Sequence, residues 1–250
     1  MMRGRGLKVL LIVVVAVAVW EAVVRLNLIN QIILAAPSHI VGAAVSDGAT
    51  FLRAFALTLL EVGAAIVLAW TLGVALGVVT GSIHTLAAAT APVLSSIFAV
   101  PFIVFYPLLI VWLGLGPASK VVFGVLSGFF PIALNTINGV RAIDQRYLAF
   151  ARSIGATPWQ TYGRIIFPLA LPAIVSGLRV GTGLCVIGVI VTEMLASLGG
   201  LGYLISYHRT LFDTGHVYLG VLLALLLAVA VNVALTAVER RVGRWRLSEE

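Results

Sequence analysis

The sequence predicts an all-α polytopic membrane protein with six transmembrane helices. Of its 250 residues, 61% are hydrophobic and only 10% are charged, whereas a soluble domain of this length has about 25% charged residues. Six apolar runs are long enough to cross a bilayer as helices. An outer-membrane barrel is excluded, because barrel strands alternate apolar and polar residues and Leu7 to Trp20 is apolar almost throughout.

The spans are expected at about 7–27, 51–80, 88–113, 117–139, 168–197 and 216–238. A short amphipathic helix is expected near 38–48. The third span is expected to bend at Pro101 and Pro107, because proline removes a backbone donor and clashes with the preceding turn. The start of the chain resembles a signal peptide, but no small-residue cleavage site follows it, so it is interpreted as a retained first helix.

These elements divide the chain into three parts. Residues 1–50 form the first span and an outer link, residues 51–238 form a five-helix core with a polar segment at 140–167, and residues 239–250 form a tail. With the N-terminus inside, twelve of the 16 Lys and Arg residues lie on the cytosolic side and four outside, namely Arg25, Arg53, Lys120 and Arg209. Because cytosolic loops are rich in Lys and Arg, both termini and the 140–167 segment are expected in the cytosol of a bacterial inner membrane.

Composition also bears on other function classes. The net charge of +7 follows from the loops and does not indicate nucleic-acid binding. Cys185, the single cysteine, lies in an apolar run, so no intrachain disulfide can form. The four histidines lack the spacing of metal ligands; His208 and His216, eight residues apart across a loop, are interpreted as a chance pair. No catalytic cluster, cofactor or metal site is predicted, so the chain is not expected to be an enzyme.

Small residues recur every four positions in three of the predicted spans. Such spacing lets helix backbones approach closely in lipid. Packing within the chain is the favoured explanation, and a subunit interface or a moving helix seam is the alternative. The positions are Gly73, Gly77, Gly81, Gly124, Gly128, Gly177 and Gly181.

Polar residues inside spans are costly and are usually functional. Glu61 is interpreted as a gate residue or as half of an ion pair with Arg179 or Arg53. Glu193 lines the path or holds the outer loop. Glu21 is expected to form an ion pair with Arg25, four residues further along the chain. The candidates for a pathway or gate are Glu61, Phe102, Phe105, Asn135, Arg179 and Glu193, each with ordinary packing or pairing as its structural alternative.

The polar segment carries a helix–turn–helix pattern. Tyr147 to Ile154 can form two helical turns that present Phe150 and Arg152 outward. Gly155 can adopt a positive φ and stop this helix. Thr157 then has the character of an N-cap, followed by proline at the first helical position. A short helix with an apolar knob and basic flanks suits docking in the groove of a partner.

This segment resembles the signature of the membrane subunits of binding-protein-dependent ABC importers. That pattern reads Glu-Ala-Ala, three residues, Gly, nine residues, Ile, one residue, Leu-Pro. The segment departs from it where Ala149 replaces Glu, Phe150 replaces Ala and Phe167 replaces Leu. The resemblance implies that ATPase coupling uses Ala149, Phe150, Ala151, Arg152, Ser153, Gly155, Ala156, Thr157, Ile165 and Pro168.

Further stretches resemble the nitrate, sulfonate and taurine branch of these importers, among them Leu171-Pro172-Ala173-Ile174 and Gly200-Leu201-Gly202-Tyr203. The resemblance implies a type I importer permease fold, a second permease copy, two cytosolic ABC ATPases that bind ATP and magnesium, and a periplasmic or lipid-anchored binding protein. It places Gly200, Gly202 and Tyr203 near the outer gate. The chain itself has no P-loop, since neither of its lysines follows glycine.

The implied substrate is a small anion such as a sulfonate, taurine or nitrate, and a neutral heterocycle or vitamin precursor is the alternative. A gradient-driven secondary transporter remains a rival. It would need paired intramembrane acids, for which Glu61 and Glu193 are the candidates. A non-transporting membrane scaffold or sensor is the second rival. The outer residues His208, Arg209 and Asp213 are interpreted as solvated charges, with docking contacts as the alternative.

Overall fold

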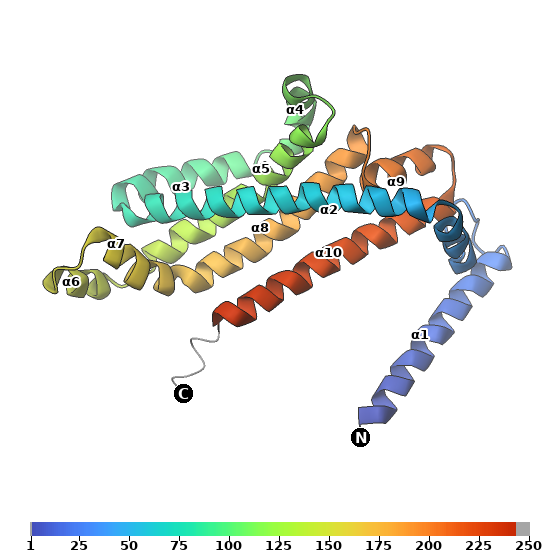
Figure 1. Cartoon of the computed structure of the whole chain (residues 1–250), viewed down its shortest axis with the longest axis horizontal. Helices are drawn as coiled ribbons and strands as arrows, with labels where there is room; N and C mark the ends of the chain where they lie inside the picture. Colours follow the sequence, from blue (N-terminus) through green and yellow to red (C-terminus); the bar gives the residue numbers. More distant parts are fainter. Residues whose placement is uncertain (1, 244–250) are drawn as a thin grey trace. The chain divides into compact units, whose positions relative to one another are not determined.

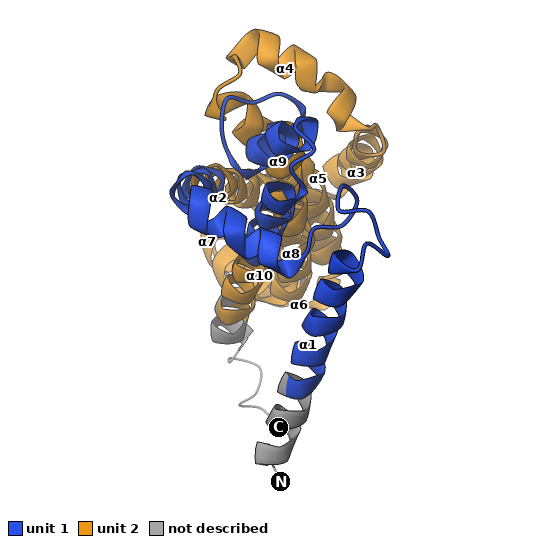
Figure 2. Cartoon of the chain, turned by 90° about the vertical axis from the view of Figure 1, so that its right-hand side faces the viewer, with its two compact units in different colours: residues 1–58, 193–227 blue, residues 59–192, 228–250 orange. Residues whose placement is uncertain are grey.

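The computed structural model describes the backbone of residues 2–243 and the side chains of residues 11–237 and 239. Every regular element in this part of the chain is helical, as the sequence predicts. The chain divides into two compact units, one of residues 1–58 and 193–227 and the other of residues 59–192 and 228–250 (Figure 2). We refer to them as unit 1 and unit 2.

The helices follow one another along the chain with short connections (Figure 1). They are α1 (Met2–Arg25), α2 (Pro37–Ser82), α3 (His84–Phe98), η1 (Phe102–Phe105), α4 (Tyr106–Leu113), α5 (Pro117–Arg141), α6 (Gln145–Ser153), α7 (Pro158–Thr161), η2 (Tyr162–Ile166), α8 (Phe167–Leu195), α9 (Leu201–Thr210) and α10 (Thr214–Gly243).

Four helical stretches of the described residues are long and apolar enough to cross a membrane: Pro37–Ser82, Pro117–Arg141, Pro158–Leu195 and Thr214–Ala237. A fifth arises if His84–Phe98 and Phe102–Leu113, which are bent by 76° at their break, form one span. The structure therefore supports four to five of the six predicted spans. The remaining one lies in α1, where the side chains of residues 2–10 are outside the described residues.

Proline explains the bend in the third predicted span. Pro101 lies in the break between α3 and η1, as predicted. Pro107 does not bend the chain, contrary to the prediction, because it occupies the first turn of α4, where its missing N–H has no helical partner to lose. α2 contains both the amphipathic helix expected near 38–48 and the second predicted span. The two are joined by a kink at Asp47.

Glycines let the helices of unit 2 pack closely. A Cβ atom added at Gly77 of α2 would lie 2.4 Å from Cβ of Thr136 on α5. Gly128 of α5 meets α8 in the same way, since an added Cβ would lie 2.7 Å from the carbonyl oxygen of Gly181. The prediction that the four-residue glycine spacing serves packing within the chain is therefore confirmed.

Unit 1 has its own apolar core, which includes Phe51 of α2, Leu201 and Leu204 of α9, and Leu219 of α10. No helix was predicted between the spans at 168–197 and 216–238, where the structure has α9 (Leu201–Thr210). Residues 201–210 form α9, because the apolar side chains on one face of this segment pack into the core while a buried carboxylate binds its N-terminus.

Candidate functional site

The polar segment of unit 2 begins with α6, which the sequence folds by a side-chain cap. The carboxylate of Asp144 accepts the backbone N–H of Arg146 at 2.9 Å and its side-chain Nε–H at 2.9 Å. These bonds, the side-chain bond foremost, lower the pKa of Asp144 below its ordinary value. The cap satisfies a backbone donor that the first turn of a helix otherwise leaves without a partner.

Gly155 ends α6, as predicted. Its φ is +68°, a conformation that costs glycine little and other residues more. The N–H of Gly155 donates to the carbonyl of Arg152 at 3.1 Å, and that of Ala156 donates to the carbonyl of Ala151 at 3.0 Å. This pair of bonds is a Schellman motif, which closes the helix and turns the chain sharply.

The predicted N-cap of the next helix is also confirmed. Thr157 and Gln160 form a reciprocal capping box, with Pro158 in the first turn of α7. The second helix is not a separate short element, however. α7 passes through the π-helical turn η2 into α8, so that Pro158–Leu195 is one continuous helix of 38 residues. Figure 1 shows α6 and α7 beyond the ends of α5 and α8.

One face of α6 is anchored to unit 2 and the other is exposed. Ala151 is 1% exposed, whereas Phe150 is 61%, Ile154 is 63% and Trp159 of α7 is 87% exposed. We call Tyr147, Phe150, Ile154 and Trp159 the apolar patch. The sequence predicted that Phe150 would point outward; it missed Trp159, although an aromatic residue directly after a helix-starting proline is visible in the sequence.

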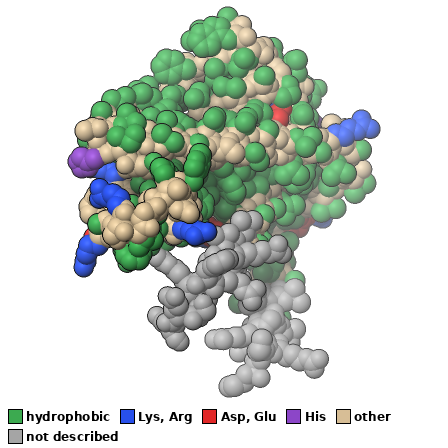
Figure 3. All heavy atoms as spheres, turned by 60° about the vertical axis from the view of Figure 1, so that its left-hand side comes forward, with side chains coloured by type: hydrophobic (Ala, Val, Ile, Leu, Met, Phe, Trp, Pro, Cys, Tyr) green, Lys and Arg blue, Asp and Glu red, His purple; other side chains and the backbone are tan. Residues whose placement is uncertain are grey.

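The other predicted coupling residues differ in their exposure. Ala149, Arg152, Ser153, Thr157 and Pro168 are exposed, and Ala156 is half-buried. Ile165 is half-buried, while its neighbour Ile166 is the one that packs in the apolar cluster with Ile143 and Ala170. Hydrophobic side chains dominate the surface in Figure 3, and most of the Lys and Arg side chains in view gather at one end.

Glu61, a predicted gate residue, forms a buried ion pair in unit 2. Its carboxylate lies 2.5 Å from Nζ of Lys120, and both side chains are 2% exposed. The prediction that Arg179 or Arg53 would be its partner was wrong. Lys120 lies in the first turn of α5, and its charge, which the sequence placed near the outer membrane surface, turns inward to meet α2.

The other pathway candidates of unit 2 also have partners. Arg179 pairs with Glu239, with Nε 3.2 Å from a carboxylate oxygen. Asn135 donates to the carbonyl oxygen of the proline one turn earlier in its own helix. Phe102 stacks on Phe130 of α5 at 5.1 Å between ring centroids. Phe105 is exposed, and its ring lies against Phe102 at 6.4 Å between centroids.

Glu193 binds the N-terminus of α9 within unit 1. It is 1% exposed, and its carboxylate accepts the N–H of Gly202 and the hydroxyl of Thr58, both at 2.8 Å. The hydroxyl of Thr58 in turn accepts the N–H of Leu201. Gly200 has φ +104°, and a Cβ there would lie 2.0 Å from Glu193. The geometry matches the holding role predicted for Glu193, since a carboxylate at a helix N-terminus is stabilised by the helix dipole.

Two further expectations concern unit 1. Glu21 pairs with Arg25, as predicted, and its carboxylate also accepts the backbone N–H and the hydroxyl of Ser38. The structure also brings together His208 and His216, whose rings stack with centroids 4.4 Å apart. Sequence spacing had offered no connection between them, and Asp213 contacts both rings instead of being merely solvated.

Comparisons with known proteins agree with this architecture. Residues 71–244 match the family described as binding-protein-dependent transport system inner membrane component. The chain is 28% identical to the putative aliphatic sulfonates transport permease protein SsuC of Bacillus subtilis (strain 168), over 99% of this chain and 91% of that one. It is 28% identical to the taurine transport system permease protein TauC of Escherichia coli (strain K12), over 92% and 86% of the two chains.

A third relative is the riboflavin transport system permease protein RibX of Chloroflexus aurantiacus, with 37% identity over 66% of this chain and 62% of that one. A chain from an inward-facing structure of the MetNI methionine ABC transporter superposes with a TM-score of 0.60 at 20% identity, over 75% of this chain and 95% of that one. At this identity the superposition shows the fold alone. Since the family match covers more than half of the chain, this multi-pass inner-membrane protein belongs to the binding-protein-dependent transport system inner-membrane components, the non-catalytic permease subunits of ABC transporters.

Proposed function

We propose that the chain pairs with a second copy to form the translocation pathway of an importer, and that ATPase subunits drive it through α6 and α7. The single observation that carries this proposal is the apolar patch. Phe150, Ile154 and Trp159 are more than 60% exposed in the polar segment, next to exposed arginines, where the sequence predicts cytosol rather than lipid. An apolar group of this kind with a polar rim is typical of a protein–protein contact.

The construction of the segment suits the transfer of force. The capped α6, the Schellman turn at Gly155 and the capping box of α7 fix the backbone without depending on a partner. A rigid helix that docks as one body passes on the motion of its partner instead of deforming. When two ATPases close on ATP, they would draw the two coupling segments together and open the pathway outward; hydrolysis would reset it.

The test replaces the largest exposed side chain of the patch. Trp159→Ala should weaken association with the ATPase subunits at least tenfold, because buried tryptophans contribute strongly at interfaces. Trp112→Ala is the matched control, since Trp112 is also exposed, at 68%, but lies on α4. Detergent-solubilised permease is titrated with purified ATPase subunits, and equal affinity for both variants would contradict the proposed docking surface.

Gly155→Val tests the turn itself. Valine at φ +68° is strained, so α6 should lose its fixed direction, and ATP hydrolysis should no longer be coupled to transport. The spans should still insert, as protease protection of the outer loops can show. Normal coupled transport in this variant would count against the role of the segment.

For the substrate we propose a small sulfonate, on the similarity to the sulfonate and taurine permeases over nearly the whole chain. A neutral heterocycle is the second candidate, because the match to a riboflavin permease has the higher identity, 37%, over a shorter stretch. Arg179 offers little help to an anion, since Glu239 neutralises it. Uptake of a radiolabelled alkanesulfonate and of riboflavin by vesicles holding the complete importer distinguishes the two.

The same proposal places both termini in the cytosol, on the excess of basic residues there. A cysteine introduced at Tyr207 of α9, an exposed position, should react with a membrane-impermeant thiol reagent in intact spheroplasts, whereas one at Phe150 should not. The opposite labelling pattern would invert the orientation. The acids that a gradient-driven carrier would need are engaged structurally, Glu61 by Lys120 and Glu193 by α9.

A further inference from the structure

We propose that His208, Asp213 and His216 of unit 1 form a binding site for a divalent transition-metal ion of the zinc class. One potential ligand atom from each residue lies within 4.8 Å of the other two. Oδ2 of Asp213 is 3.3 Å from Nδ1 of His208 and 2.6 Å from Nδ1 of His216. Two imidazoles and a carboxylate are a frequent ligand set of zinc sites that leave one position for water.

The turn between α9 and α10 assembles this set. Phe212 has φ +56°, an uncommon conformation for a residue other than glycine. The N–H of Asp213 donates to the carbonyl of His208 at 3.0 Å, and that of Phe212 to the carbonyl of Arg209 at 3.2 Å. The resulting Schellman turn reverses the chain within a few residues, so that the end of α9 and the start of α10 present their side chains to each other.

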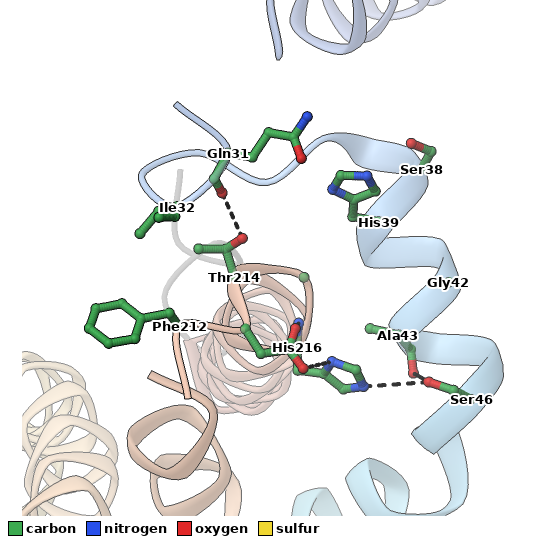
Figure 4. A pocket seen from close by; sticks show the side chains of 12 residues that line it. Gln31, Ile32, Ser38, His39, Gly42, Ala43, Ser46, Phe212, Thr214 and His216 are labelled. Atoms are coloured by element: carbon green, nitrogen blue, oxygen red, sulfur yellow. Dashed lines mark hydrogen bonds and ion pairs between the residues drawn. The ribbon is translucent and has the colours of Figure 1, made fainter. Parts of the chain in front are cut away.

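A second set of contacts orients His216. Its Nε2 lies 2.9 Å from Oδ2 of Asp47 on α2, and that carboxylate oxygen also accepts the hydroxyl of Ser46 at 3.0 Å. A carboxylate on the far nitrogen of a histidine fixes the tautomer that leaves the other nitrogen free for a metal. In Figure 4 the His216 ring lies between the start of α10 and the part of α2 that carries Ser46.

The surroundings also suit an ion. Phe51 packs against both rings, at 5.9 Å from the centroid of His208 and 6.0 Å from that of His216. His216 and Asp213 also line a hollow of about 520 Å³, through which an ion can enter and water can supply a fourth ligand. The ligands therefore have an apolar neighbour in Phe51 and border a hollow that reaches the surface.

Binding requires a small rearrangement. Ligand atoms around a tetrahedral zinc ion are about 3.3 Å apart, given bonds of about 2.0–2.1 Å, so the 2.6 Å contact must lengthen when the metal replaces the shared proton. The rings are nearly parallel, at 7°, so at least one must turn about its Cβ–Cγ bond to aim its Nδ1 at the ion. That torsion is broad for histidine, and a turn of the His208 ring leaves the contact between His216 and Asp47 in place.

The test uses cobalt(II) as a spectroscopic probe, on the full chain purified in detergent through an affinity tag without histidine. We expect one equivalent of Co²⁺ to bind with the strong visible absorption of a tetrahedral site, and Zn²⁺ to displace it. His208→Ala should weaken binding at least a hundredfold, and Asp47→Asn about tenfold, as loss of an outer partner does. His39→Ala is the matched control, since His39 lines the same hollow without belonging to the cluster.

Two results would overturn the site. Absence of a tetrahedral cobalt spectrum at stoichiometric metal would show that the cluster only binds protons. Equal cobalt affinity in His208→Ala and in His39→Ala would place the metal elsewhere on the chain. A thermal scan gives a second readout that needs no transport, because metal that binds the folded state raises the melting temperature; zinc should raise it for the wild type and for His39→Ala but not for His208→Ala.

Discussion

Replacing Lys120 by methionine should destabilise the permease more than removal of any exposed charge. The perturbation leaves Glu61 without its partner in a site where both side chains are only 2% exposed. Removal of one member of a buried ion pair costs about 3–5 kcal/mol in soluble proteins, because the remaining charge stays buried without compensation. We expect a loss of that size in the free energy of unfolding.

The structure also gives the size of the attraction that is lost. With 2.5 Å between Nζ of Lys120 and the carboxylate of Glu61, an effective dielectric constant of about 20 gives an attraction of roughly 7 kcal/mol. Desolvation of the two ions costs several kcal/mol each, so the intact pair is close to neutral for stability. The double variant Glu61→Leu with Lys120→Met should therefore recover most of the stability that the single variant loses.

The assay is denaturant unfolding in detergent of the wild type, the two single variants and the double variant. Arg209→Met is the matched control, because Arg209 is exposed and its loss should change stability by less than about 0.5 kcal/mol. A double variant as unstable as Lys120→Met would refute the pairing argument. A stable double variant that transports normally would also remove Glu61 from the list of gate residues.

The packing glycines and the carboxylate of Glu193 give two further predictions. Gly77→Val should lower the free energy of unfolding by about 1–3 kcal/mol through overpacking, because the new side chain meets Thr136. Gly63→Val is the control, since Gly63 lies on the same helix with nothing within 4 Å of an added Cβ, and its loss in the same unfolding assay should be less than half as large. Equal losses for the two variants would contradict the close contact. Glu193→Gln keeps an acceptor but removes its charge, so its bond to the N–H of Gly202 should weaken by about 1 kcal/mol. Hydrogen exchange in α9 should become faster, and unchanged exchange would exclude the capping role.

The features of the polar segment 140–167 that the sequence predicted correctly are those that a few adjacent residues determine. A positive φ at Gly155, a cap at Thr157 and a proline in the first helical turn depend on local backbone chemistry. The continuation of α7 into α8 was missed because a π-helical turn at 162–166 has no comparable local signal. The sequence predicted that a span begins at residue 168, whereas Pro168 lies inside the continuous helix Pro158–Leu195.

Side-chain partners between helices were harder to predict. The pairing of Glu61 depends on how α2 lies against α5, and that in turn depends on the contact between Gly77 and Thr136. The sequence supplied these glycines but not which helix each one meets. Lys120, at the end of a predicted span, was therefore counted with the outer charges and not considered as the partner.

The histidine cluster illustrates a different limit. A helix that ends at Thr210 and another that begins at Thr214 can bring His208 and His216 together only if the chain reverses between them. The reversal depends on a left-handed Phe212, and phenylalanine is not a residue whose presence indicates that conformation. Eight residues of separation consequently carried no signal until the turn was known.

The continuity of α7, η2 and α8 has a mechanical consequence. From Pro158 to Thr192 the helix lies within unit 2 and covers 35 residues, which at about 1.5 Å per residue is roughly 50 Å. It can act as a lever: a tilt of about 5° would displace its far end by roughly 4 Å over that length. Motion applied at Trp159, where ATPase docking is proposed, would then reach Thr192 through the continuous helix.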